Sequence, residues 1–115
     1  MPANTSPIFT LTPRAVTAII AAANTARDGS GTLVDVLTAS TNGTRIDFLT
    51  FTSSQATAAA SAARVQRVFI TDTSGLNPRI ISEVVLSAVT ASTTAIGATV
   101  TITFTNGLIL ASGQK

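Results

Sequence analysis

The side chains of this 115-residue chain that could do chemistry are hydroxyls and a few carboxylates, because the sequence contains no His, Cys, Trp or Tyr. A Ser or Thr hydroxyl becomes a nucleophile only beside a base. Without His, that base would have to be Lys115, the one lysine, at the end of the sequence. The lack of Cys excludes disulfides and thiolate zinc sites. The residue types therefore argue against nucleophilic catalysis.

The five acidic residues are the remaining candidates for acid–base or metal chemistry: Asp28, Asp35, Asp47, Asp72 and Glu83. None lies in a glycine-rich phosphate loop or a recognised acid–base motif. Asp28 and Asp72 are predicted in turns, while Asp47 and Glu83 are predicted at solvent-facing strand positions, paired with Arg across strands. Asp28 and Ser30 together offer two side-chain oxygens, short of the roughly six to eight ligands of calcium. We therefore expect that the protein is not an enzyme and that it binds neither a metal nor a cofactor.

The clearest structural signal is a ladder of threonines that alternate with apolar residues over 98–105. Alternation with a period of two predicts a β-strand with one apolar face and one polar face. The remaining predicted strands cover residues 8–12, 32–38, 44–52, 64–71, 79–89 and 108–110. About eight short strands, without amphipathic helices between them, predict an all-β protein: an antiparallel β-sandwich or a jelly-roll-like barrel.

The segments between the strands carry turn signals and two ambiguities. Asn42-Gly43 and Asn106-Gly107 are the dipeptides most typical of tight turns between strands. Residues 13–24 fit a helix that begins at Pro13, and they fit a strand rich in β-branched residues, which we favour. The Ala-rich stretch 55–63 is expected to be a loop or a short helix.

Length and composition predict one domain that does not bind nucleic acid or membranes. Residues 8–115 are expected to form a single β-sandwich domain, preceded by an extended arm, residues 1–7, that Pro2 and Pro7 bracket. The opening lacks a signal peptide and no apolar run is long enough to span a bilayer, so synthesis in a cytoplasm is expected. Charged residues are only 10% of the chain, and the scattered arginines form no basic cluster.

The stretch 44–52 has apolar residues at positions that a regular strand would place on both faces. Ile46 and Phe48 share one face, and Leu49 and Phe51 share the other. Either a β-bulge at Phe48-Leu49 turns all four toward one core, or one face contacts a neighbouring subunit. We favour subunit contact, because residues 33–37 and 80–89 show the same two-faced pattern. The predicted interaction residues are therefore Leu49 and Phe51, together with Pro2, Ala3, Asn4 and Pro7 of the arm.

Several stretches resemble a family of small tailed-bacteriophage virion structural proteins. They are the opening Met-Pro-Ala-Asn-Thr-Ser-Pro-Ile-Phe, residues 23–32 and 39–47, and more weakly 67–72 and 83–90. The resemblance implies a capsid decoration or cement protein on the virion head surface, a dimer or trimer that binds the major capsid protein. Tail, baseplate or fibre proteins are the main alternative, and a lectin-like receptor-binding module is a third. The sequence departs from the family where it stops soon after 107–110, since a further turn and strand are expected there.

Overall fold

All regular secondary structure in the computed structural model is β, over the residues that it describes: 15–54, 60–92 and 94–115. The strands are β1 (Thr44–Thr52), β2 (Ala60–Ser61), β3 (Arg64–Ile70), β4 (Arg79–Leu86), β5 (Val89–Thr90) and β6 (Thr99–Leu110). The expected arm at 1–7 and strand at 8–12 lie outside these ranges. The all-β prediction is confirmed, and the strands expected at 44–52 and 64–71 form within a residue of their predicted bounds.

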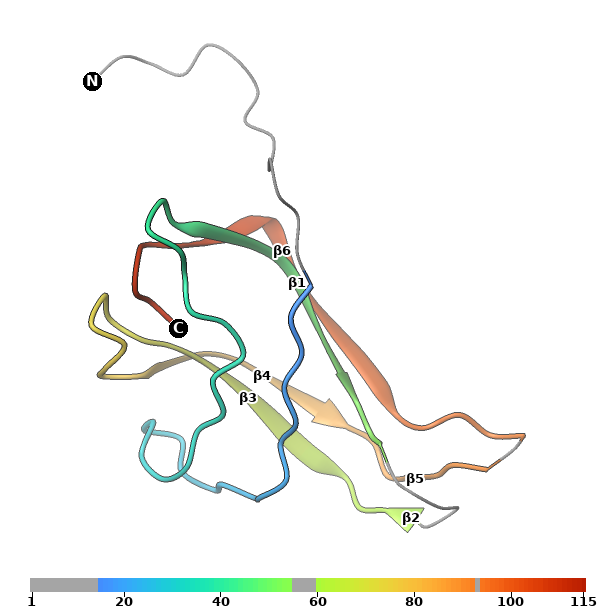
Figure 1. Ribbon diagram of the computed structural model, residues 1–115. Helices are drawn as coiled ribbons and strands as arrows, with labels where there is room; N and C mark the ends of the chain where they lie inside the picture. Colours follow the sequence, from blue (N-terminus) through green and yellow to red (C-terminus); the bar gives the residue numbers. More distant parts are fainter. Residues whose placement is uncertain (1–14, 55–59, 93) are drawn as a thin grey trace.

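The strands form three antiparallel pairs: β1 with β6, β3 with β4, and β2 with β5. β4 contacts β6, so the β1–β6 and β3–β4 pairs lie against each other (Figure 1). The part of the chain that the structure describes thus contains six strands rather than about eight. The predicted strand at 79–89 is divided into β4 and the short β5.

The threonine ladder forms as predicted and lies on the outer face of the β1–β6 pair. Thr50 is opposite Thr101, and Thr52 is opposite Thr99. The Oγ1 atoms of Thr50 and Thr101 are 3.0 Å apart, a hydrogen-bond distance. The alternating apolar residues of β6 (Val100, Ile102 and Phe104) are half-buried on the opposite face.

The turn predicted at Asn106-Gly107 is a bulge within one strand. Both residues have the positive φ that an Asn-Gly turn uses, 65° and 80°. The pairing jumps from Phe48 opposite Thr103 to Ile46 opposite Leu108, and β6 continues along β1. Residues 108–110 thus extend β6 instead of forming a separate strand, because their partner is the start of β1.

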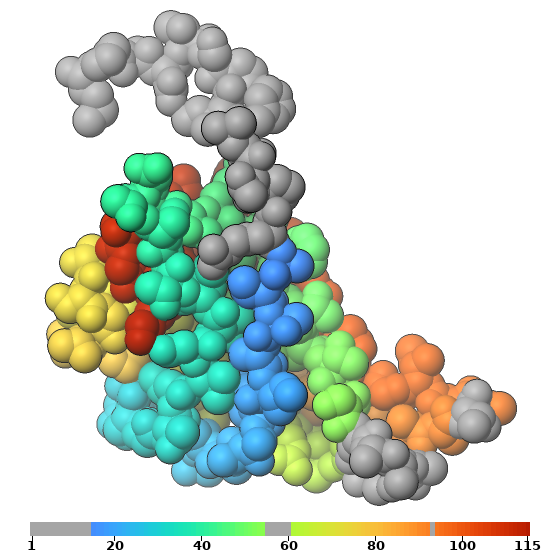
Figure 2. Space-filling model, in the orientation of Figure 1, coloured from blue at the N-terminus to red at the C-terminus, as the bar shows by residue number. Residues whose placement is uncertain are grey.

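Residues 15–43 correct two predictions, because they contain neither helix nor strand. Over the described part of 13–24 both alternatives are wrong, and the strand predicted at 32–38 does not form. Val34 and Val36 are each 39% exposed, so this stretch packs with one side only. The segment crosses the face presented in Figure 2, where it covers much of the two strand pairs. β-propensity describes how a residue fits a paired sheet, and here no described strand pairs with the segment.

The turn at 40–43 forms, with the Gly43 N–H donating to the Ser40 carbonyl at 2.9 Å. It leads from the unpaired segment into β1, so the hairpin predicted there is absent. Close by, the last residues of the chain lie between two other segments. Ala39 N–H donates to Gln114 O at 2.8 Å, and Thr71 N–H donates to Lys115 O at 3.2 Å. The end of the chain thus joins the segment before β1 to the end of β3.

The buried core among the described residues is small. Only Ala39, Leu86 and Leu110 are buried there, and Leu110 is 2% exposed. Leu86 ends β4 and Leu110 ends β6. Twelve large hydrophobic side chains are exposed in the same part of the chain. Five of the twelve lie on strands and the other seven lie in the segments between them, so apolar surface that can meet other molecules is present on both.

Candidate interaction surfaces

The strand β1 places its apolar residues differently from both sequence interpretations. The pairing irregularity lies between Ile46 and Phe48, and Asp47 and Phe48 are consecutive exposed residues. Ile46, Leu49 and Phe51 are therefore half-buried on the same face, while Phe48 is 63% exposed. The bulge gathers three of the four residues, and the outward aromatic is Phe48.

The candidate contact residues of β1 therefore differ from those predicted. Leu49 and Phe51, predicted to face a neighbour, line the inner side of β1. The other predicted contacts (Pro2, Ala3, Asn4 and Pro7) lie outside the described residues. One extra residue in a strand moves every following side chain to the opposite face. Where that residue falls in β1 is determined by the pairing with β6.

The outer face of the β3–β4 pair carries an apolar patch formed by Val65, Ile81 and Val85, here called the valine patch. Val65 and Val85 are directly opposite each other across the pair, and are 45% and 60% exposed. Ile81 belongs to the same exposed face of β4 and is 40% exposed. The two-faced pattern at 80–89 therefore does leave one apolar face in solvent within this chain.

A charged cluster lies on the same outer face. The Glu83 carboxylate accepts hydrogen bonds from Arg27 (Nε at 2.8 Å and Nη2 at 3.0 Å) and from Arg67 Nε at 2.9 Å. These two guanidinium groups hold the pKa of Glu83 below its usual value. Arg67 is opposite Glu83 across the pair, which confirms the predicted cross-strand partner. No sequence pattern indicates the contact with Arg27, because this residue is remote from Glu83 along the chain.

The other carboxylates have local structural roles. Asp28 accepts from the backbone N–H and hydroxyl of Ser30, and these bonds lower its pKa. Asp72 accepts from Leu76 N–H, the Asn77 side chain and Ser74 N–H, which lower its pKa in that order. Both are turn residues, as predicted. Asp47 pairs with Arg45 of its own strand at 2.8 Å rather than across strands.

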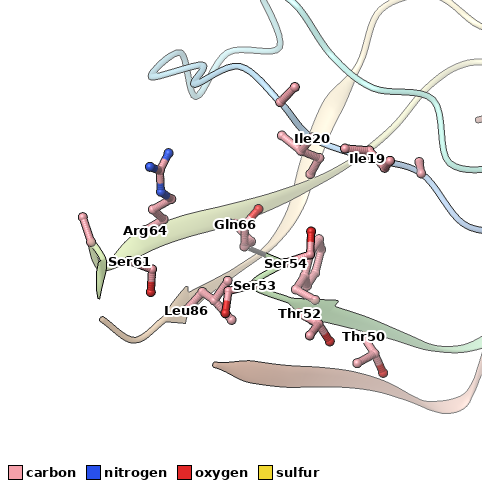
Figure 3. A pocket seen from close by; sticks show the side chains of 14 residues that line it. Ile19, Ile20, Thr50, Thr52, Ser53, Ser54, Ser61, Arg64, Gln66 and Leu86 are labelled. Carbon is pink, nitrogen blue, oxygen red and sulfur yellow. The ribbon is translucent and has the colours of Figure 1, made fainter. Parts of the chain in front are cut away.

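An open groove of about 330 Å³ lies between the strand pairs and residues 18–21 (Figure 3). Ile19, Ile20, Phe51 and Leu86 give it apolar walls, and hydroxyl groups of β1 and of residues 53–54 line it too. Arg64 and Gln66 of β3 stand on its other side. Ile19 is 82% exposed, so the apolar wall of the groove is uncovered.

Within the described ranges no group of three acidic side chains is close enough to hold a metal ion. No helix there is long and apolar enough to cross a bilayer. No protein-family model matches the sequence, and no curated protein or solved structure matches it either.

Proposed function

We propose that this protein is a non-enzymatic structural component of a tailed-bacteriophage virion, a decoration or cement protein that binds the major capsid protein on the head surface as a homo-oligomer. One observation carries the proposal. In the described part of the chain only three hydrophobic residues are buried, whereas twelve large hydrophobic residues are exposed. Apolar area of this extent on a small domain is typical of surfaces that other subunits cover.

The chemistry of the surface supports the same role. The valine patch lies on the same face as Glu83, whose charge is paired with Arg27 and Arg67. Phe48 lies opposite Thr103 and next to Asp47, whose charge is paired with Arg45. Such a surface loses little solvation free energy when a neighbour covers it. A cement protein repeats one modest contact many times over a shell, so that weak individual contacts add up to firm attachment.

In the assembled particle, we propose that the protein forms a sandwich or jelly-roll-like barrel of about eight strands. The β1–β6 and β3–β4 pairs would supply its two layers. A neighbour or an additional segment would supply the remaining strands.

The resemblance of residues 1–9, 23–32 and 39–47 to phage virion proteins favours a head protein, and a tail, baseplate or fibre component is the alternative. Electron cryo-microscopy of the intact particle separates them: density for this chain on the head shell supports the proposal, and density on the tail overturns it in favour of the alternative. A lectin-like function would instead give binding of the purified protein to a glycan array.

The arm, residues 1–7, provides a second test. Deleting it should leave the domain folded and weaken attachment to particles, because an extended arm adds contact area outside the domain. Attachment is measured by the fraction of protein that sediments with heads lacking their own copies. Full attachment of the deletion variant would remove the arm from the proposal.

A further inference from the structure

One edge of β3 has no strand partner among the described residues. β3 pairs with β4, and β4 occupies only one of its two edges. The groove lies between β3, represented by Arg64 and Gln66, and residues 18–21 (Figure 3). An unpaired edge beside an exposed apolar wall is the setting in which a sheet accepts an added strand.

The groove lies beside the start of β3, and the last residues of the chain lie beside the end of β3. Gln114 and Lys115 lie between Ala39 and Thr71 and form backbone hydrogen bonds with both. The Gln114 side chain also donates to Thr71 O at 2.9 Å. A peptide segment therefore fits between β3 and the segment of residues 15–43. Toward Arg64 no described segment continues in this position, and the groove is found there.

We propose that the groove and the free edge of β3 bind residues 8–12 of a second copy of this chain as an added β-strand. This segment, Ile-Phe-Thr-Leu-Thr, alternates with a period of two. Phe9 and Leu11 would share one face and cover Ile20, Phe51 and Leu86 in the groove. Ile8 and Thr10 would share the other face, beside Val65. Five residues span about 17 Å, so they would cover part of the seven-residue β3 and leave room for Gln114 and Lys115 at its other end.

The connection to the described chain explains why the segment comes from a second copy. Residues 18–21 form one wall of the groove. The stretch that leads to them, from residue 15 onward, contains no turn or bend up to residue 21. For residues 8–12 of the same chain to pair back into the groove, the reversal would fall on Pro13 and Arg14. Two-residue hairpin turns need a positive φ at their first position, which proline cannot adopt. Parallel addition would need a far longer connection.

The absence of Cys in this sequence allows a direct test by disulfide cross-linking. Full-length protein with Thr10→Cys is mixed with ¹⁵N-labelled protein with Val65→Cys, and Ile8→Cys and Thr12→Cys are used in turn to cover the alternative registers. After mild oxidation, mass spectrometry identifies the cross-linked peptides. Directly opposed side chains on neighbouring strands have Cβ atoms at distances close to those that a disulfide bridges. Ser112→Cys, at an exposed position, replaces Val65→Cys in the matched control.

We expect the mixed disulfide with Val65→Cys to form at least tenfold more than that with the control at one of the three positions. Adding Phe9→Asp and Leu11→Asp should abolish the difference. A protein that carries Thr10→Cys and Val65→Cys in the same chain tests the origin of the strand. If it forms the disulfide within one chain at nanomolar concentration, strand addition from a second copy is overturned. If no position exceeds the control, the proposal is overturned.

This inference deepens the self-association that is part of the proposed function, and its test needs no phage particle. Cross-linking between copies in solution, without attachment to phage heads, would overturn the cement function alone. Attachment to heads without cross-linking between copies would overturn the strand addition alone.

Discussion

Arg27 and Glu83 form a two-point ion pair between the segment before β1 and the outer face of β4. Arg27 donates from Nε to Oε1 at 2.8 Å and from Nη2 to Oε2 at 3.0 Å. Arg67 donates to the same carboxylate, and its Nη1 donates to the Asn24 carbonyl at 3.3 Å. Because residues 15–43 have no strand hydrogen bonds, these contacts are among those that fix the segment on the strand pairs.

Replacing Arg27 with Ala should loosen this segment without unfolding the strands. We expect backbone amides of residues 24–38 to exchange with deuterium several-fold faster, while those of β3 and β4 change little. The matched control is Arg45→Ala, which removes an exposed ion pair formed within β1. Equal exchange in the two variants would contradict a fastening role for Arg27.

The charged cluster of Glu83, Arg27 and Arg67 predicts how the stability of the protein depends on pH. Arg27 and Arg67 lower the pKa of Glu83, so in the folded state this carboxyl gives up its proton more readily than in the unfolded chain. Its contribution is fully present above the unfolded-state pKa, about 4.3, and is lost as the pH falls through the lower folded-state pKa. Melting temperatures measured from neutral to acidic pH should therefore fall less steeply for Glu83→Gln than for the unaltered protein. An unchanged slope would contradict the linkage.

Two adjacent residues of β6 test where the core lies. Leu110 is 2% exposed and Ile109 is 73% exposed. Leu110→Ala should lower the free energy of unfolding by about 3 kcal/mol, through lost burial and the cavity left behind. Ile109→Ala should change it by no more than about 0.5 kcal/mol. Urea denaturation measures both, and comparable losses would mean that Ile109 is covered in solution by another copy.

The exposed apolar surface predicts that the protein self-associates. Light scattering at micromolar concentration should give a mass above the 11.6 kDa of one chain. Val85→Asp places a charge at the centre of the valine patch and should shift the population toward the monomer, since a buried unpaired charge is costly. Ser112→Asp, at an exposed position outside the patch, is the control. A monomer before any substitution would contradict the prediction.

The strands β1 and β3 were predictable because local patterns determine them. Thr44–Thr52 and Arg64–Ile70 are rich in β-branched and aromatic residues, and Thr44–Thr52 also follows the turn at 40–43. The roles of Asp28 and Asp72 were also predictable, since an Asp side chain bonds to backbone N–H groups a few residues ahead. In each case the interacting groups are close neighbours in the sequence.

The composition of the strands, their alternation and the shortage of reactive groups follow from the amino-acid order alone, because they depend on residue type and short spacing. The packing of distant segments placed Phe48 outward, since the bulge depends on how β1 pairs with β6. It also decided that residues 32–38 stay unpaired and that Arg27 meets Glu83, because both depend on segments far apart in the sequence. A strand needs a partner, and only the folded chain determines which edges have one.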